Sequence, residues 1–332
     1  MPQTKTIVIT GGAGFIGSHL AERLLRDEDN RVLIFDSFRH KQHSNLDGIK
    51  EHPRLEILDG DVRNPGQIRE LITKNTDQIY HLSSIVGIQH YCDDPLEVID
   101  VNVIGTRHVV EAAMKHDVRM LFTSTSEVFG RNPNVPWDED DDRVVGSTSV
   151  DRWSYSTSKA LCEHMIFGLT KHKGLRCSIV RFFNVYGPRQ NPIFVVSKGI
   201  HRALNGQAPL MYDSGLQNRC FTYVQDAVEG MMRAANYDAA IGEAFNIGNN
   251  QPTTIRRINE LILELCGQQG RLTIEPVDTG KLYGKSYEDI QHRVPKVEKA
   301  KKQLDWSATI PVEEGLSRCI AWARANPWWL ST

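Results

Sequence analysis

A glycine-rich turn near the N-terminus limits the possible folds more than any other feature of this sequence. The segment "TGGAGFIG" (residues 10–17) follows an apolar run at 6–10 and precedes a helical pattern at 18–27. Its first glycines allow a tight turn and a close approach of the backbone to a pyrophosphate, and its last glycine allows the helix to pack closely. The helix N-terminus also offers amide groups and a positive dipole to phosphates. The spacing therefore predicts a dinucleotide-binding turn formed by Gly11, Gly14, Phe15, Ile16 and Gly17.

Short apolar runs alternate with longer helical patterns through the first half of the chain. This alternation predicts repeated strand–helix–strand units, and hence an α/β fold with a Rossmann-type, doubly wound parallel sheet. After about residue 185 the alternation ends, and prolines separate shorter elements. We therefore expect a cofactor-binding domain over 1–184, a smaller C-terminal substrate-binding domain over 185–332, and a strand near 243–248 that returns to the main sheet. The other expected strands lie at 6–10, 31–35, 55–58, 78–82, 119–124 and 176–183.

Acidic residues at the ends of the second and third expected strands indicate which dinucleotide is bound. Asp36 ends the second strand, and an acid in that place accepts hydrogen bonds from the adenine ribose and repels a 2′-phosphate. The expected cofactor is therefore NAD rather than NADP. Asp61 and Val62, in "GDV", are expected beside the adenine. The alternative is a glycine turn followed by an unrelated surface aspartate.

Balanced charge and scattered cysteines argue against several classes of protein. The chain has 39 Lys and Arg residues against 41 Asp and Glu residues, so its charge favours neither nucleic acid nor an anionic membrane as a partner. No apolar run approaches the roughly 20 residues of a membrane-spanning helix, and no signal-peptide pattern precedes the first strand. The six cysteines form no C-x-x-C pair, which suggests neither disulfides nor a metal site and favours a cytoplasmic location. The acidic run at 137–142 is interpreted as a solvated loop.

A tyrosine and a lysine four residues apart, in "YSTSK", form the first candidate for catalysis. Tyr155 and Lys159 lie on one face of a predicted helix, where such a pair is often only a surface contact. Here they follow a dinucleotide-binding turn and the hydroxyl of Thr125, which ends a buried strand. An ammonium ~4 Å from a phenolate, at an effective dielectric of ~20, is worth ~4 kcal/mol, or roughly three pKa units. Tyr155 is therefore predicted to act as a general base, with Thr125 holding the substrate oxygen.

These motifs resemble those of the extended short-chain dehydrogenase/reductase superfamily, which includes nucleotide-sugar epimerases, dehydratases and decarboxylases. "TGGAGFIG", "GDV", "HLSS", "STSEVFG", "YSTSK", "RFFNVYGPR" and "FNIG" occur in the order typical of that superfamily. The resemblance implies a catalytic triad of Thr125, Tyr155 and Lys159, with Asn102 supporting the lysine. It implies further cofactor contacts from Leu82, Ser83, Ser84 and Val185. It also implies that the C-terminal domain binds a UDP-sugar through Asn184, Arg189, Val195, Leu210, Tyr212, Arg219 and Arg293.

The two residues after Thr125 separate the activities within this superfamily. The resemblance implies a shared first step, in which sugar carbon 4 loses a proton and a hydride. Dehydratases then use an Asp-Glu pair, whereas this chain has Ser126 and Glu127, and "TSE" is similar to the motif of the UDP-glucuronic acid decarboxylases. Tyr91 and Arg219 also match residues of those decarboxylases. The expected reaction is NAD-dependent oxidation at carbon 4 and loss of the carbon 6 carboxylate, which gives UDP-4-keto-pentose, UDP-xylose or both. Glu127 is expected to act on carbon 5, and Arg219 on the carboxylate or the diphosphate.

Other activities stay open at this point. His90 stands where the decarboxylases have an acid, and Lys296 stands where family members often have an aspartate. A UDP-sugar 4-epimerase acting on UDP-glucose or UDP-glucuronate, or a nucleotide-sugar 4,6-dehydratase, would use the same first step. A non-catalytic NAD-binding scaffold is disfavoured, because such a protein has no need of Thr125, Tyr155 and Lys159 together.

Two long helices, at about 94–116 and 155–172, are expected to form a four-helix interface in a homodimer. In the superfamily this chain resembles, such helices commonly pair across two subunits. Their apolar residues recur at helical spacing, although the same stripe could face only its own sheet. The residues concerned are Val98, Val101, Val109, Ala112 and Ala113 on the first helix, and Leu161, Met165 and Leu169 on the second.

Overall fold

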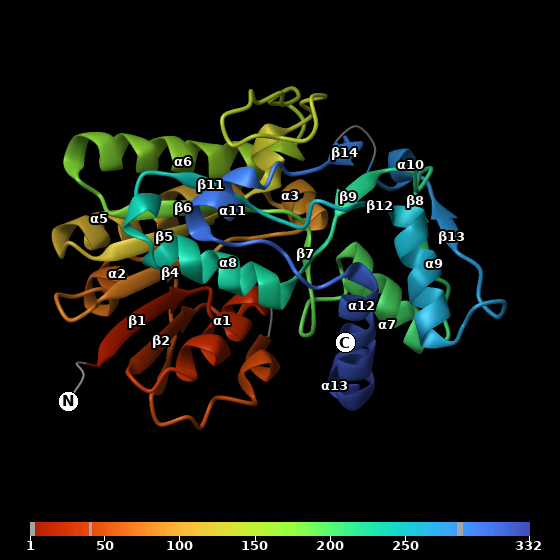
Figure 1. The fold of residues 1–332 in the computed structure, drawn as a ribbon, viewed down its shortest axis with the longest axis horizontal. Helices are drawn as coiled ribbons and strands as arrows, with labels where there is room; N and C mark the ends of the chain where they lie inside the picture. Colours follow the sequence, from red (N-terminus) through yellow and green to blue (C-terminus); the bar gives the residue numbers. More distant parts are fainter. Residues whose placement is uncertain (1–3, 40–41, 284–287) are drawn as a thin grey trace.

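A seven-stranded parallel sheet forms the centre of the molecule (Figure 1). The computed structural model describes residues 4–39, 42–283 and 288–332, and the strand order in its main sheet is β11-β6-β5-β4-β1-β2-β3. This doubly wound order confirms the predicted fold class. The segment expected to return to the sheet does so as β11, which pairs with β6 at the edge. The strands are β1 Lys5–Thr10, β2 Asn30–Asp36, β3 Leu55–Asp59, β4 Gln78–His81, β5 Arg119–Thr125, β6 Cys177–Phe182 and β11 Ala244–Ile247.

Helices cover both faces of the sheet because alternate strand residues point to opposite sides. Ile7 and Ile9 of β1 belong to one buried cluster, and Val8 between them belongs to another. The first cluster packs under α1 Phe15–Leu25, α8 Val224–Asn236 and α11 Glu298–Leu304, and the second packs under α2 Pro65–Leu71, α5 Thr106–Lys115 and α6 Trp153–Lys173 (Figure 1). Shorter helical segments lie in the connections between these elements: η1 Gln42–Leu46, α3 Ile88–Asp93, α4 Pro95–Ile99, η2 Asp100–Gly105, η3 Ser126–Phe129 and η4 Asp238–Ala240.

The C-terminal part forms a smaller group of helices and short strands beside the carboxyl ends of the main strands (Figure 1). A single buried cluster includes both Ile9 of the sheet and Ile262 of this group, so the two parts share a core. The domain boundary near residue 184 stays a prediction. The helices here are α7 Val195–Leu204, α9 Ile255–Cys266, α10 Thr279–Tyr283, α12 Val312–Ala325 and α13 Pro327–Leu330, and the strands are β7 Val185–Tyr186, β8 Leu210–Tyr212, β9 Asn218–Cys220, β10 Thr222–Tyr223, β12 Pro252–Thr254, β13 Glu275–Val277 and β14 His292–Arg293.

The acidic run at 137–142 is not simply a solvated loop, contrary to the interpretation from sequence. The Trp137 side chain is fully buried, and its indole nitrogen donates a hydrogen bond to the Asn132 carbonyl at 3.0 Å. Glu139 is also buried, and its carboxylate accepts the backbone N–H of Asn246 in β11 at 2.8 Å. The loop therefore anchors the edge of the main sheet through two of its residues, while the neighbouring aspartates give it a hydrophilic composition.

The apolar stripe proposed for a dimer interface mostly faces the protein's own sheet. The five predicted residues of the first helix are all buried in the cluster beneath α5 and α6. Two apolar side chains outside the predicted set are exposed instead, Leu96 at 71% and Ile104 at 43%, and Leu161 of the predicted set is 53% exposed. Of the predicted set, only Leu161 is strongly exposed, so the expectation was wrong for the first helix.

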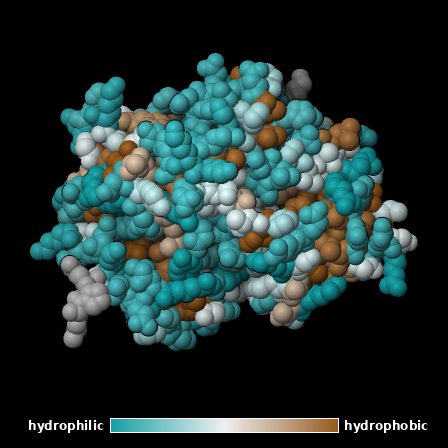
Figure 2. Space-filling view, viewed as in Figure 1, coloured by the Kyte–Doolittle hydropathy of each residue, from teal (hydrophilic) through white to brown (hydrophobic). Residues whose placement is uncertain are grey.

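The outer surface is mainly hydrophilic on the face drawn in Figure 2, where hydrophobic residues occur in small separate patches. Among the described residues, no helix combines the length and the apolar composition needed to cross a bilayer.

We predict opposite stability effects when alanine replaces two glycines that both lie inside helices. A Cβ on Gly17 of α1 would lie 2.4 Å from the carbonyl oxygen of Gly11, whereas a Cβ on Gly168 of α6 would meet no atom within 4 Å. Gly17→Ala should therefore lower the free energy of unfolding by about 1–3 kcal/mol through overpacking. Gly168→Ala should raise it by about 0.5–1 kcal/mol, because alanine favours the helix. Urea unfolding measures both, and an unchanged Gly17→Ala variant would contradict the predicted packing of α1 on the turn.

Candidate active site

A continuous cleft of about 520 Å³ lies at the carboxyl ends of the central strands. Ligands of open α/β sheets bind at this edge, where the strand order reverses. The cleft extends from the glycine turn after β1 to Tyr212 of β8 in the C-terminal part. Its walls include most of the residues predicted for the cofactor and the substrate, so the sequence motifs meet in one place.

One end of the cleft is shaped for close contact between backbone and ligand. Gly11 has φ of +72°, and a Cβ there would lie 2.7 Å from the backbone nitrogen of Ser83. The Asp36 carboxylate accepts the N–H groups of Ala13 and Phe38, both at 3.0 Å, and thereby fixes the turn while it lines the cleft. The other predicted cofactor residues that line this end are Gly14, Phe15, Ile16, Asp61, Val62, Leu82, Ser83, Ser84 and Val185.

The three predicted catalytic residues lie together at the centre of the cleft. Thr125 ends β5, while Tyr155 and Lys159 are on adjacent turns of α6. The hydroxyls of Ser84 and Thr125 are hydrogen-bonding partners of the Tyr155 phenol. The Tyr155 ring stacks on the ring of Tyr91, with 4.7 Å between centroids and 5° between planes. The hydroxyls and the stacked ring fix the phenol beside Thr125, so Tyr91 acts here on the orientation of the catalytic tyrosine.

Lys159 is held by the backbone of the strand beside it, and its predicted action on the tyrosine stays a prediction. Lys159 Nζ donates a hydrogen bond to the Thr123 carbonyl at 2.9 Å, and burial lowers its pKa to about 8. Burial, with the nearby charge of Glu127, raises the pKa of Tyr155 above its ordinary value. The protein groups by themselves therefore keep Tyr155 protonated at neutral pH.

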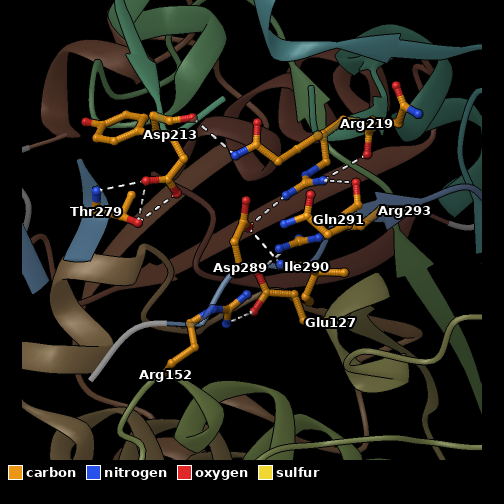
Figure 3. Close-up of polar contacts among 12 residues, drawn as sticks. Glu127, Arg152, Asp213, Arg219, Thr279, Asp289, Ile290, Gln291 and Arg293 are labelled. Carbon is orange, nitrogen blue, oxygen red and sulfur yellow. Dashed lines mark hydrogen bonds and ion pairs between the residues drawn. The ribbon is translucent and has the colours of Figure 1, made fainter. Parts of the chain in front are cut away.

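A buried carboxylate lies between two arginines (Figure 3), two residues after the predicted catalytic Thr125. Glu127 accepts hydrogen bonds from Arg152 at 2.6 Å and from Arg293 at 3.1 Å. Burial alone would raise the pKa of Glu127, but the two guanidinium groups outweigh it and lower the pKa to about 2. Glu127 is thus a permanent carboxylate in this arrangement. A carboxylate of this pKa is poorly suited to donate a proton at neutral pH, and the predicted action of Glu127 on carbon 5 stays a prediction.

Arg219 is held by a second carboxylate in the same cleft (Figure 3). Its guanidinium pairs with Asp289 at 3.0 Å and donates to the backbone carbonyls of Asn218 at 2.8 Å and Gln291 at 3.3 Å. The side chain is only 8% exposed. Arg219 is therefore oriented by the protein before any ligand binds. A substrate anion bound there would compete with Asp289 for the guanidinium of Arg219.

Four predicted residues do not line the cleft. Arg189 forms an ion pair with Glu22 at 2.7 Å, and Leu210 is half-buried on β8. Gly17 lies beneath the glycine turn. Asn102 lies behind the catalytic helix, where it accepts the Ser84 hydroxyl at 2.7 Å and donates to the Ser158 hydroxyl at 2.9 Å, so no described contact joins it to Lys159 itself. The remaining predicted substrate residues, Tyr91, Asn184, Val195, Tyr212, Arg219 and Arg293, all line the cleft.

Several residues of the site were not identified from sequence. Lys198 lines the cleft, and its ammonium donates to the Tyr212 hydroxyl at 3.1 Å. Gln217 and Asp289 also line the cleft, and Arg152 lies behind Glu127. The only signal for Arg152 was the "RW" pair before the catalytic tyrosine, and an arginine before a helix ordinarily indicates an exposed residue.

Comparison with known proteins identifies the family. The family model described as GDP-mannose 4,6 dehydratase matches residues 8–319. The chain belongs to this family. Membership in the GDP-mannose 4,6 dehydratase family agrees with the predicted relationship to the extended short-chain dehydrogenase/reductase superfamily.

Individual members of the family resemble the chain over nearly its whole length. A UDP-N-acetyl-alpha-D-glucosaminuronate decarboxylase of Bacillus cytotoxicus is 37% identical over 96% of this chain and 98% of its own. UDP-glucuronic acid decarboxylase 1 of Xenopus tropicalis is 34% identical over 96% of this chain and 72% of its own. The crystal structure of dTDP-glucose 4,6-dehydratase from Bacillus anthracis in complex with NAD superimposes with a TM-score of 0.85 and 26% identity, over 98% of each chain.

Glu127→Gln should destabilise the protein at neutral pH. The change leaves two buried arginines without a carboxylate, and breaking such a pair typically costs about 3–5 kcal/mol of unfolding free energy. Because the pKa of Glu127 in the folded protein is about 2, below its ordinary value of 4.5, its contribution is complete above about pH 4.5 and is lost as the pH falls toward 2.

Urea unfolding of the wild type and Glu127→Gln should therefore show a constant difference from pH 8 to pH 5 and a smaller one below. Glu56→Gln is the matched control, since Glu56 pairs with Arg31 on the surface and its loss should change the free energy of unfolding little. A Glu127→Gln variant as stable as the wild type would contradict the ionised state of Glu127.

Proposed function

We propose that the protein is an NAD-dependent decarboxylase of UDP-glucuronic acid. The observation that carries this proposal is the buried carboxylate of Glu127, which lies between Arg152 and Arg293 and comes two residues after Thr125. Two cations and one anion leave an excess positive charge in the cleft, which suits a sugar that itself carries a carboxylate. Relatives named as decarboxylases of UDP-uronic acids support the same reading.

NAD fits the residues at the glycine end of the cleft. The backbone around Gly11 leaves space that a Cβ would fill, and Asp36 faces the cleft where it would bind ribose hydroxyls and repel a 2′-phosphate. Tyr155 and Lys159 lie between this end and the sugar site. When bound, NAD accepts the hydride of sugar carbon 4 and can return it, so it serves catalytically.

Tyr155 and Thr125 handle the hydroxyl of sugar carbon 4. Thr125 holds the oxygen. The positive charges of a bound nicotinamide ring and of Lys159 would favour the phenolate of Tyr155, which then accepts the proton of that oxygen. A carbonyl at carbon 4 makes the sugar a β-keto acid, which loses carbon dioxide and leaves an enolate between carbons 4 and 5. Water that enters the cleft would then supply the proton for carbon 5. Glu127 stays ionised throughout and keeps Arg293 in place, because its pKa of about 2 makes it poorly suited to supply the proton. Ser126, which is buried beside it, replaces the acid that dehydration requires.

The opposite end of the cleft is suited to the nucleotide. Tyr212 presents an aromatic ring and Lys198 a cation at this end, and we assign them to the uracil and its diphosphate. Asn184 lines the cleft with φ of +39°, and its side-chain oxygen has no hydrogen-bond partner among the described residues. Asn184 and Arg219 would therefore complete the diphosphate site, with Arg219 exchanging part of its contact to Asp289 for the ligand.

A uronic acid with an acetamido group at carbon 2 is the second candidate substrate. The observation in its favour is the 37% identity to the Bacillus cytotoxicus decarboxylase, which acts by name on UDP-N-acetyl-alpha-D-glucosaminuronate. Both substrates would use the same carboxylate site and the same chemistry at carbon 4. The difference between them concerns only the space around carbon 2.

Incubation of the purified protein with NAD and each UDP-uronic acid tests the function. We expect release of carbon dioxide. By mass spectrometry the product should be lighter by carbon dioxide if the pentose is released, and by carbon dioxide and two hydrogens if the keto pentose is released. A product lighter by one water would instead indicate a dehydratase. An unchanged mass with a shifted anomeric NMR signal would indicate a 4-epimerase, and no reaction at all would indicate a scaffold. Any of these three results overturns the proposal. Comparison of the turnover of the two substrates shows whether the site accepts a hydroxyl or an acetamido group at carbon 2. Accumulation of NADH would show that the keto product is released.

We also propose that two subunits pair through α4 and α6. These helices pack side by side, and Leu96 of α4 and Leu161 of α6 are 71% and 53% exposed. Exposed leucines so close together favour burial against a second copy. A cytoplasmic location is consistent with the five buried cysteines, which form no disulfide: Cys162, Cys177, Cys220, Cys266 and Cys319.

Light scattering at micromolar concentration should show a dimer. The double variant Leu96→Glu/Leu161→Glu should be monomeric, because each carboxylate would be buried in the interface. Leu216→Glu is the matched control, since Leu216 is 61% exposed but lies outside α4 and α6 and should not change the mass. A monomeric wild-type protein would contradict the proposed dimer.

A further inference from the structure

Arg152 is the most deeply buried cation of the site and was assigned no role above beyond its contact with Glu127. The residue is 0% exposed and comes immediately before α6, where its guanidinium lies 5.3 Å from the centre of the Trp153 ring. It is not among the residues that line the cleft. Arg152 therefore lies behind the wall of the cleft, and the described contact that links it to the lining residues is its ion pair with Glu127.

Arg293, by contrast, faces both the cleft and Glu127. One of its terminal nitrogens donates to Glu127, while its Nε is buried and has no hydrogen-bond partner among the described residues. Arg293 therefore retains a donor that a ligand in the cleft can use. Its charge is only partly compensated by Glu127, because Arg152 is bound to the other oxygen of the same carboxylate.

The remaining charged groups around the clamp do not cancel this excess. By the clamp we mean Glu127 with Arg152 and Arg293. Arg219 is balanced by Asp289, and the buried Arg181 is balanced by Glu163. The rings that face Glu127 are Tyr91 and Tyr155, and burial keeps both of these phenols neutral. Lys159 adds a further positive charge near the cleft. The clamp thus holds two positive charges on one carboxylate, in a buried place.

We propose that Arg152 is a positioning residue that determines specificity: its buried charge offsets Glu127, leaves Arg293 able to bind an anion, and so makes the site select a sugar carboxylate over a neutral sugar. This inference rests on the proposed function, because it assumes a uronic acid substrate. It goes beyond that function in naming a residue behind the wall of the cleft as the source of the selectivity. Without Arg152, Glu127 would neutralise Arg293, and the clamp would have no net charge.

Charge effects of this kind have a predictable size. A neighbouring charge within about 4–6 Å shifts an ionisation equilibrium by about one to three pKa units, or ten- to a thousandfold. Arg152 acts across Glu127 from a greater distance, so about tenfold is expected for its effect on affinity for a carboxylate.

The test compares affinities for UDP-glucuronic acid and UDP-glucose by calorimetry in the presence of NAD. Each variant is built in a Tyr155→Phe background, so that neither ligand is consumed. Arg152→Met should reduce the preference for UDP-glucuronic acid about tenfold while affinity for UDP-glucose stays nearly constant. Arg152→Lys retains the charge and should restore most of the preference. Glu127→Gln removes the anion of the clamp and should raise the preference.

Arg131→Met provides the matched control. Arg131 also lies against Trp153, at 5.7 Å, but is 44% exposed and pairs with Glu288, so its loss should leave the preference unchanged. An Arg152→Met variant that weakens both ligands equally, or neither, would overturn the inference and leave Arg152 a structural residue. If Arg152→Met does not fold, Glu127→Gln provides the test. A preference for UDP-glucuronic acid over UDP-glucose that falls or stays constant in Glu127→Gln would also overturn the inference. Failure of the proposed function would be seen in a different measurement: the unmodified protein would release no carbon dioxide from UDP-glucuronic acid.

Discussion

The ionised Glu127 between Arg152 and Arg293 is the interaction on which the rest of the site depends. These residues come from three distant parts of the chain: the segment after β5, the start of α6, and β14 of the C-terminal part. Their pairing joins the sheet to the C-terminal part across the cleft (Figure 3). A buried ion pair adds little net stability compared with apolar packing, but removing one partner is costly. The clamp is therefore best explained by its charge beside the catalytic Thr125.

The parallel sheet provides the geometry that the clamp needs. Its strands end at one edge, so the turn after β1, Asp36 of β2 and Thr125 of β5 face the same cleft although they are distant in sequence. The C-terminal part then covers the far end of the cleft with Tyr212, Lys198 and Arg219. This arrangement brings the glycine turn, the phenol of Tyr155 and the arginine-rich end of the cleft together in one site.

Local sequence patterns predicted the fold and much of the cleft, while pairings between distant residues escaped them. Glycine spacing and strand periodicity are local, so the turn at Gly11 and all seven strands of the main sheet were found. The buried roles of Trp137 and Glu139 were hidden by the aspartates around them. Motif position placed Arg189 in the substrate site, yet its φ of +68° and its ion pair with Glu22 take it elsewhere. Arg219 and Asp289 meet only through tertiary structure, as do Glu127 and its two arginines.

A crystal structure of Tyr155→Phe with NAD and UDP-glucuronic acid tests the central claim most directly. Our account predicts that the sugar carboxylate lies within hydrogen-bonding distance of Arg293, while Glu127 keeps its contact with Arg152. A sugar carboxylate bound by Arg219 alone, with Glu127 released from both arginines and directed at carbon 5, would contradict the account.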